Sequence, residues 1–195
     1  MIATAQDIAG QMGEKREAEG SKWADAAFEK LYLANYVRIV GVLCRLVGDR
    51  TRAEELANDV FWRLYRQRLL LDRDGNVAGW LYRTATNVGI DALRASVRRR
   101  QYEGAAARLK VEAGTDTSPL EEVLREEKRS RVRAVLARLK PVQAQLLILR
   151  AGGFSYKELA EALGVKGGSV GTMLARAEAE FHRSYIEAYG QGEEP

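Results

Sequence analysis

The spacing of apolar residues constrains the fold of this chain most strongly. From residue 28 onward, apolar side chains recur at steps of three and four positions, which is the period of a helix that buries one face. The first such run contains Phe28, Leu31, Tyr32, Ile39, Val40, Leu43, Leu46 and Val47. Later segments repeat the same period between turn residues. The sequence therefore predicts an all-α protein.

Turn and capping residues divide the first part of this pattern into helices. Gly48 ends the first helix, and Thr51 followed by Glu54 predicts a capping box at the start of the second. Residues 71–76, LDRDGN, have the composition of a turn. A third long helix begins near Trp80 and ends in arginines. We therefore expect three helices before residue 101.

The second part of the chain has its own capping signals. It opens with Ser118, Pro119 and Glu121, which is the order of a cap, a first-turn proline and a capping-box acid. Pro141 starts another helix, because a proline is not tolerated inside one. These signals predict two successive helices between residues 119 and 151.

A short helix and a long helix follow. Ser155 and Glu158 cap a helix of about two turns, which Gly164 closes. A longer helix runs from about residue 168 to residue 189. A short helix, a tight turn and a long helix are the layout of a helix-turn-helix, in which the second helix enters the major groove of DNA.

Residues 101–118 separate the two parts, since they contain glycines and only scattered apolar positions. We therefore expect two small helical domains, at 23–100 and 119–190, joined by a flexible linker at 101–118. The polar leader, residues 1–22, is expected to be disordered, and residues 191–195 form a tail.

Composition excludes several classes of function. The chain has one cysteine, Cys44, and one histidine, His182, among 195 residues. This rules out an internal disulfide and a thiolate zinc cluster, and no catalytic triad, phosphate-binding loop or metal-ligand spacing is present. No apolar run approaches a signal peptide or the roughly 18 residues of a membrane span. We therefore expect a cytoplasmic protein that is not an enzyme, with no metal, no cofactor and no membrane insertion.

Three sequence blocks carry a specific resemblance. AEELANDVFWRLYR, WLYRTATNVGIDALR and SYKELAEALGV occur in this order between residues 23 and 187. In order and spacing they resemble sigma factors of the extracytoplasmic-function (ECF) group. The resemblance implies a protein that binds core RNA polymerase, directs it to promoter DNA and helps to open the minus-ten region. It also implies an anti-sigma protein as a partner. The net charge of +4 and the pI near 9.2 fit binding to a polyanion.

The second predicted helix resembles the family's polymerase-binding helix. Exposed acid and amide groups beside an aromatic anchor suit a partly polar protein interface. Phe61 is expected in the core, which leaves the neighbouring aromatic residue for the partner. The residues that we assign to polymerase are Glu55, Asn58, Asp59 and Trp62.

The turn at 71–76 and the helix after it resemble the element that captures a base flipped from the minus-ten region. Basic groups there can bind phosphate, and amide groups can pair with base edges. Arginines at the C-terminal end of a helix also interact favourably with the helix dipole. The alternative interpretation is therefore that these arginines are a solvated helix end and do not bind DNA. The residues assigned to this strand are Asp74, Asn76, Arg83, Asn87, Arg94, Arg98 and Arg99.

The last helix resembles the reader of the minus-thirty-five element, with one departure. Gly171 and Met173 stand where the family usually has basic residues. Fewer phosphates can then be neutralised, so affinity for duplex DNA should depend less steeply on salt. The residues assigned to this element are Lys166, Ser169, Thr172 and Arg176.

Two other functions remain open. A DNA-binding regulator that does not bind polymerase would explain the helix-turn-helix but not the first two blocks. A metal-dependent nucleic-acid hydrolase would have to use Glu54, Glu55 and Asp59, although such acids among arginines are more typical of a solvated helix face. Co-purification with core polymerase distinguishes a sigma factor from a regulator.

Overall fold

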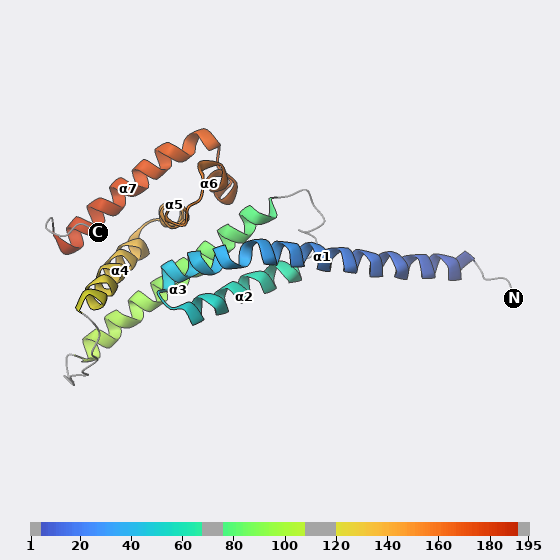
Figure 1. The fold of residues 1–195 in the computed structure, drawn as a ribbon, viewed down its shortest axis with the longest axis horizontal. Coiled ribbons are helices and arrows are strands. Elements are labelled where there is room, and N and C mark those ends of the chain that lie inside the picture. The colour runs from blue at the N-terminus through green and yellow to red at the C-terminus, as the bar shows by residue number, and fades with distance from the viewer. Residues whose placement is uncertain (1–4, 68–75, 108–119, 191–195) are drawn as a thin grey trace.

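The computed structural model describes residues 5–67, 76–107 and 120–190. Within these ranges the chain forms seven α-helices and no strand (Figure 1). The helices are α1 (Ala5–Val47), α2 (Arg50–Arg66), α3 (Val77–Ala107), α4 (Leu120–Arg138), α5 (Pro141–Ala151), α6 (Tyr156–Leu163) and α7 (Gly167–Tyr189). The prediction of an all-α protein is confirmed.

The first half of the molecule, α1 to α3, packs its apolar side chains into a core that continues into the second half. The second part of α1 lies beside α2 and α3 (Figure 1). Phe61 on α2 is 2% exposed and packs edge-on against the rings of Phe28 and Tyr32, with centroids 6.3 and 4.8 Å away. The expectation that Phe61 belongs to the core is confirmed. Gly48, at a φ of +77°, ends the first helix as predicted.

The second half, α4 to α7, contains the predicted helix-turn-helix. Pro141 is the first residue of α5. Ser155 and Glu158 form the expected capping box at the start of α6, with the Glu158 amide donating to Ser155 Oγ at 3.3 Å. Gly164 closes α6 in the left-handed conformation, at a φ of +67°. The long helix α7 follows after Val165 and Lys166.

The predicted capping box at the start of α2 is wrong. Asp49 caps this helix instead, because its extended backbone lets its carboxylate accept the Arg52 amide at 2.8 Å. Thr51 therefore lies inside the helix, and Glu54 pairs with Arg50 at 2.9 Å. The aspartate two residues earlier supplies a stronger acceptor than the threonine hydroxyl.

Two predicted boundaries differ from the structure. α3 continues to Ala107, so the first residues of the expected linker are helical, and residues 108–119, with Ser118 and Pro119, lie outside the described residues. α1 begins at Ala5, where a disordered leader was expected. The leader lacks proline and is rich in alanine, glutamate and lysine, which favour a helix. The tail at 191–195 lies outside the described residues.

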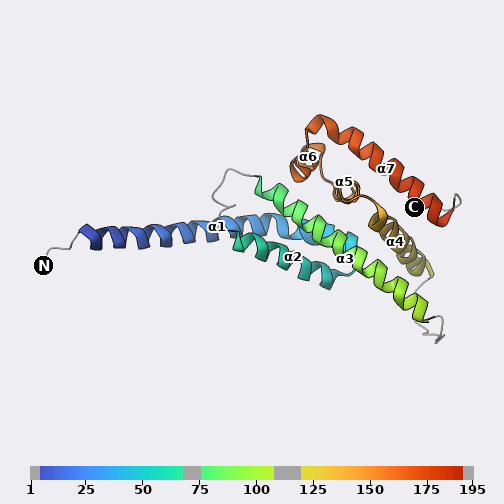
Figure 2. The ribbon, with the colours of Figure 1, turned by 180° about the vertical axis from the view of Figure 1, so that it is seen from behind.

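The two halves pack against each other along α3. This helix has α1 and α2 on one side, and α4, α5 and α6 lie on the other (Figure 2). The interface between the halves therefore follows the length of α3. In the described ranges, no helix is both long enough and apolar enough to cross a membrane.

Candidate nucleic-acid and polymerase-binding surfaces

The residues assigned to polymerase lie on one exposed face of α2. Glu55, Asn58, Asp59 and Trp62 are all exposed, and their spacing places them on the side opposite the core. Trp62 is 60% exposed and stacks on Tyr65, with ring centroids 5.7 Å apart. We call these four residues the polymerase row. It combines a large apolar surface with acid and amide groups.

Four residues assigned to the minus-ten strand lie along α3, and we call them the minus-ten face. They are Asn76, Arg83, Asn87 and Arg94. Asn76 caps α3, because its Oδ1 accepts the Gly79 amide at 2.7 Å. The other three are separated by four and seven residues, which places them on one side of the helix. The structure therefore places these four residues along one side of α3 and its N-terminal cap.

The minus-ten face is in contact with the second half of the molecule. Asn76 Nδ2 donates to the carbonyl oxygen of Glu161 at 2.9 Å, and Arg83 Nε donates to that of Ala162 at 2.9 Å. Both acceptors belong to the last turn of α6. This end of the minus-ten face is therefore bonded to the helix-turn-helix.

The other end of the minus-ten face contacts α4 and α5. Arg94 donates from Nε to the carbonyl oxygen of Ala137 at 3.1 Å and from Nη2 to that of Leu139 at 3.0 Å. Asn87 Oδ1 accepts Gln145 Nε2 at 2.7 Å. All four residues of the minus-ten face are therefore hydrogen-bonded across the interface between the halves.

The other residues assigned to the minus-ten DNA strand, Asp74, Arg98 and Arg99, are not part of the minus-ten face. Asp74 lies outside the described residues. Arg98 and Arg99 are exposed one turn beyond Arg94. Their neighbour Arg100 donates to Ser130 Oγ on α4 at 3.0 Å. The predicted arginine cluster is thus divided between solvent and the interface.

The residues assigned to the minus-thirty-five element are exposed at the start of α7. Ser169, Thr172 and Arg176 share one side of the helix, and Lys166 lies in the turn before it. We call these four residues the minus-thirty-five face. The opposite side of α7 buries Val170, Leu174 and Ala177. The short helix α6 packs against α7 and holds this face outward.

Gly171, which departs from the family pattern, is not required by packing. A Cβ atom there would lie 3.6 Å from the Tyr156 ring, an ordinary van der Waals contact. The structure itself therefore has room for a side chain at this position.

An ion pair between α1 and α6 was not predicted. Arg38 Nη1 lies 2.8 Å from Glu158 Oε1, and the Arg38 guanidinium carbon lies 4.1 Å from the centroid of the Phe154 ring. The Ser155 amide, the Arg38 guanidinium and the Ser155 hydroxyl lower the pKa of Glu158 from 4.5 to about 2. Because 120 residues separate the two partners, no local pattern could have indicated the pair.

An aromatic contact completes this part of the interface. The rings of Tyr82 on α3 and Phe154 before α6 meet edge-on, with centroids 4.6 Å apart. Tyr82 donates to Asn35 Oδ1 at 2.8 Å, and burial raises the pKa of its hydroxyl. Phe154 is 1% exposed, so this contact is the apolar centre of the interface.

The acids on α2 are arranged as a solvated face. Glu54 pairs with Arg50, and Glu55 pairs with Arg52 at 2.7 Å. Across the described parts of the chain, no group of three or more histidine, cysteine, aspartate or glutamate residues is placed to hold a metal ion. This arrangement disfavours the hydrolase alternative.

Comparison with known proteins gives two family matches. Residues 31–99 match the model of sigma-70 region 2, and residues 129–181 match that of sigma-70 region 4. Together they cover more than half of the chain. The first match contains α2 and the minus-ten face, and the second contains the helix-turn-helix.

Individual proteins match over most of the chain. ECF RNA polymerase sigma factor SigE of Mycolicibacterium smegmatis is 28% identical over 87% of this chain and 65% of its own length. The RNA polymerase sigma-H factor of Pseudomonas aeruginosa is 27% identical over 86% of this chain and 85% of its own. A solved structure, the sigma factor RpoE with the anti-sigma factor NepR from Bartonella quintana, has a TM-score of 0.46 and 18% identity, and the match covers 80% of this chain and 95% of that one. The chain belongs to the ECF group of RNA polymerase sigma factors.

Proposed function

We propose that this chain binds core RNA polymerase in the cytoplasm, directs it to specific promoters and helps to open the minus-ten region. One observation carries the proposal. The two matched sigma regions coincide with the helices that present the polymerase row, the minus-ten face and the minus-thirty-five face. The family consists of initiation factors rather than enzymes, so the chain contributes binding and strand separation.

The polymerase row would form the contact with the enzyme. Trp62 offers a large apolar surface that loses its water when a partner covers it. Asn58 and Asp59 beside it supply hydrogen-bonding groups that fix the orientation of the complex. Since the opposite side of α2 is buried in the core, docking needs no rearrangement of this helix.

The minus-ten face would hold the non-template strand. Flipping a base out of the duplex costs a few kcal/mol, which stacking, base-edge hydrogen bonds and phosphate contacts must offset. Asn76 and Asn87 can pair with base edges, while Arg83 and Arg94 can bind phosphates. Arg98 and Arg99 extend the basic surface along the same helix.

The minus-thirty-five face would contact duplex DNA upstream. Ser169, Thr172 and Arg176 project from the first turns of α7, where side chains of a recognition helix reach base edges. Lys166 is placed to contact a phosphate. With only two basic residues in this face, we propose a weak contact whose affinity falls gently with salt.

The direct test is transcription in vitro. Purified core polymerase would be mixed with the full chain and a pool of promoter sequences, and the transcripts would be sequenced to locate their start sites. We expect defined start sites that are missing with core polymerase alone. Absence of any such site would refute the proposal and leave the DNA-binding regulator as the better interpretation.

We also propose that an anti-sigma protein binds the chain, as the family implies. Mixing the purified chain with a candidate inhibitor should abolish the transcripts in the same assay. An inhibitor that left transcription unchanged would not be this partner.

A further inference from the structure

Three residues of the minus-ten face donate hydrogen bonds to backbone carbonyl oxygens at helix ends. The fourth, Asn87, bonds to a side chain. The acceptors for Asn76 and Arg83 are carbonyl oxygens in the last turn of α6, and those for Arg94 lie at the end of α4. The last four carbonyls of a helix have no partner inside it, and the helix dipole makes them partly negative. The arginines therefore find, within the chain, acceptors that resemble phosphate oxygens.

Gly79 permits this close approach. A Cβ atom at Gly79 would lie 2.6 Å from the carbonyl oxygen of Glu161, nearer than real Cβ atoms come. The backbones of α3 and α6 can therefore meet here only because Gly79 has no side chain. At Gly164 a Cβ atom would lie 2.6 Å from Arg83 Nη2, the end of a flexible side chain, so a side chain there would shift Arg83 rather than the backbone.

The minus-ten face differs from the other two functional surfaces in its contacts with the rest of the chain. The polymerase row and the minus-thirty-five face are exposed. Asn76, Arg83 and Asn87 of the minus-ten face are exposed as well, but every residue of this face is hydrogen-bonded to the second half. A strand of DNA must displace α4, α5 and α6 to use the atoms that they hold, which include Arg83 Nε and Asn87 Oδ1. The folded chain thus ties the minus-ten face to the second half through hydrogen bonds.

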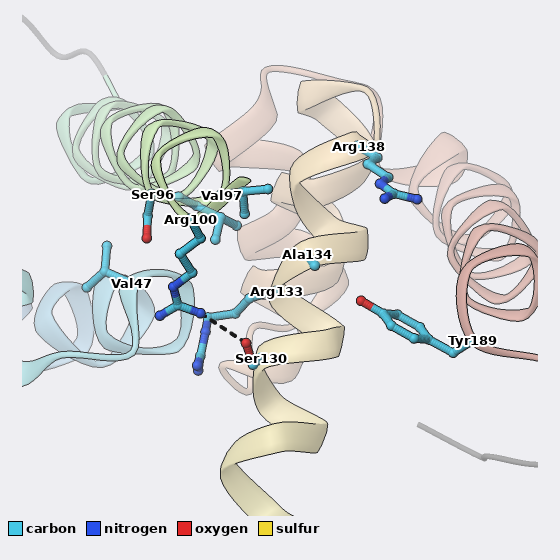
Figure 3. Close-up of a pocket in the computed structure, with 10 residues that line it drawn as sticks. Val47, Ser96, Val97, Arg100, Ser130, Arg133, Ala134, Arg138 and Tyr189 are labelled. Carbon is cyan, nitrogen blue, oxygen red and sulfur yellow. Dashed lines mark hydrogen bonds between the residues drawn. The ribbon is translucent and has the colours of Figure 1, made fainter. Parts of the chain in front are cut away.

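The interface between the halves combines buried apolar side chains, which form one cluster across both halves, with unfilled space. One end holds a pocket of about 270 Å³ between α3, α4 and the end of α7, lined by Ser96, Arg100, Ser130 and Arg133 among others (Figure 3). A second cleft, of about 770 Å³, lies where α1 meets α4 and α5. Interfaces between the domains of one chain resemble transient protein–protein interfaces, in which the partners separate.

We propose that the free protein is self-occluded: its second half covers the minus-ten face with helix ends that take the place of DNA phosphates, and the two halves must separate before the non-template strand can bind. This inference rests on the proposed function, because it concerns the surface assigned to that strand. The apparent affinity for single-stranded DNA is then reduced by the fraction of molecules that are open.

The first test uses Gly79→Ala in the full chain. The added methyl group would meet the carbonyl oxygen of Glu161 and so pushes the two halves apart. It would also displace the side chain of Asn76, which caps α3, so a second variant away from Asn76 is needed. We expect Gly79→Ala to bind short, fluorescently labelled single-stranded DNA of random sequence about tenfold more tightly than the wild type. Gly41→Ala is the matched control, since its Cβ atom would meet only an Arg45 side-chain nitrogen at 3.4 Å.

A second variant avoids the neighbourhood of Asn76. Arg38→Ala removes the ion pair between the halves and leaves the Ser155–Glu158 cap in place. Arg183→Ala is its control, because it loses one positive charge and ion pairs that lie within α7. We expect tighter binding of single-stranded DNA by Arg38→Ala than by Arg183→Ala. Equal affinities within both matched pairs would overturn the proposal.

Fluorescence transfer reports the opening without DNA. Dyes would be placed on Ala26→Cys in α1 and Ala179→Cys in α7, both exposed positions, in a Cys44→Ala background. We expect one high-transfer population for the free protein, lower transfer in Gly79→Ala, and lower transfer when core polymerase is added. A free wild-type protein with the same low transfer as Gly79→Ala would also overturn the proposal.

The two proposals fail in different ways. A wild-type chain that directs transcription but shows low transfer when free would refute self-occlusion and keep the sigma function. A chain that closes, opens in Gly79→Ala and yet supports no start site would refute the sigma function and keep the closed state.

Discussion

Arg83 and Arg94 donate to backbone carbonyls rather than to carboxylates. A carbonyl at a helix end carries only part of a charge, whereas a DNA phosphate carries a full one, and hydrogen bonds between two charged groups are roughly twice as strong as neutral ones. The exchange of a carbonyl for a phosphate therefore favours DNA once the strand is present. A carboxylate at the same place would hold each arginine more tightly and oppose that exchange.

At the polymerase row, we predict that Asn58→Ala with Asp59→Ala weakens binding to core polymerase. Both side chains are exposed, so the free energy of unfolding should change by no more than about 0.5 kcal/mol. Binding can be measured by titrating labelled protein with core enzyme. Glu178→Ala, an exposed change on α7, serves as the control. Unchanged affinity in the double variant would show that this face of α2 is not the contact.

Glu158 should titrate far below an ordinary glutamate. Its pKa of about 2 lies below 4.5, so the charged form stabilises the folded state at every pH above about 4.5, and this contribution is lost as the pH falls toward 2. Carboxyl resonances followed by NMR should give a midpoint near 2 for Glu158. In Arg38→Ala the midpoint should rise, because one of the groups that stabilise the charge is gone. A wild-type midpoint near 4.5 would contradict the ion pair.

At the scale of helices, local chemistry made most boundaries predictable. Gly48, Pro141 and Gly164 end or start helices as expected, since each acts on its own backbone and needs no distant partner. The start of α2 was mispredicted because Thr51 followed by Glu54 matches the capping-box pattern, whereas the stronger cap, Asp49, lies two residues earlier. The sequence left open whether the first residues after position 100 extend α3, because glycine in a polar segment is compatible with either a linker or a helix, and in the structure α3 continues to Ala107.

Gly164→Ala should destabilise the protein by about 1 kcal/mol or more. The residue has a φ of +67°, which costs roughly this much for alanine, and the new methyl group would also displace Arg83. Urea denaturation measures the change. Gly168→Ala, in helix α7 with open space around it, is the control and should be neutral or slightly stabilising. Equal effects would argue against the strained turn.

At the scale of the whole molecule, the candidate surfaces were predictable one by one, but their relation was not. The resemblance indicated which side chains lie on α2, α3 and α7. It did not indicate that Asn87 meets Gln145 or that Arg94 meets the end of α4. The interface contacts of this kind join groups that lie 43 to 85 positions apart in the chain. Many of the acceptors are backbone carbonyls, which every residue has. Such contacts therefore leave no pattern in the sequence.

The second half expressed alone should be less stable around α6. In the full chain, Phe154 is buried against Tyr82, and exposing a phenylalanine side chain costs about 1.5 to 3 kcal/mol. Amides of α6 should then exchange with deuterium roughly ten to a hundred times faster in a fragment of residues 120–195 than in the full chain. Equal protection in the two would show that contact with the first half adds nothing to this region.

The cover on the minus-ten face has a property that a separate inhibitor lacks. Because α4 and α6 belong to the same chain as α3, their local concentration at this face is set by the length of the connecting segment and not by the amount of protein in the cell. If the chain were overproduced, its copies would outnumber the molecules of a separate inhibitor. Each copy would still carry its own second half, which covers its minus-ten face. The fraction of uncovered molecules would then follow the supply of core enzyme and not the dose of the chain itself.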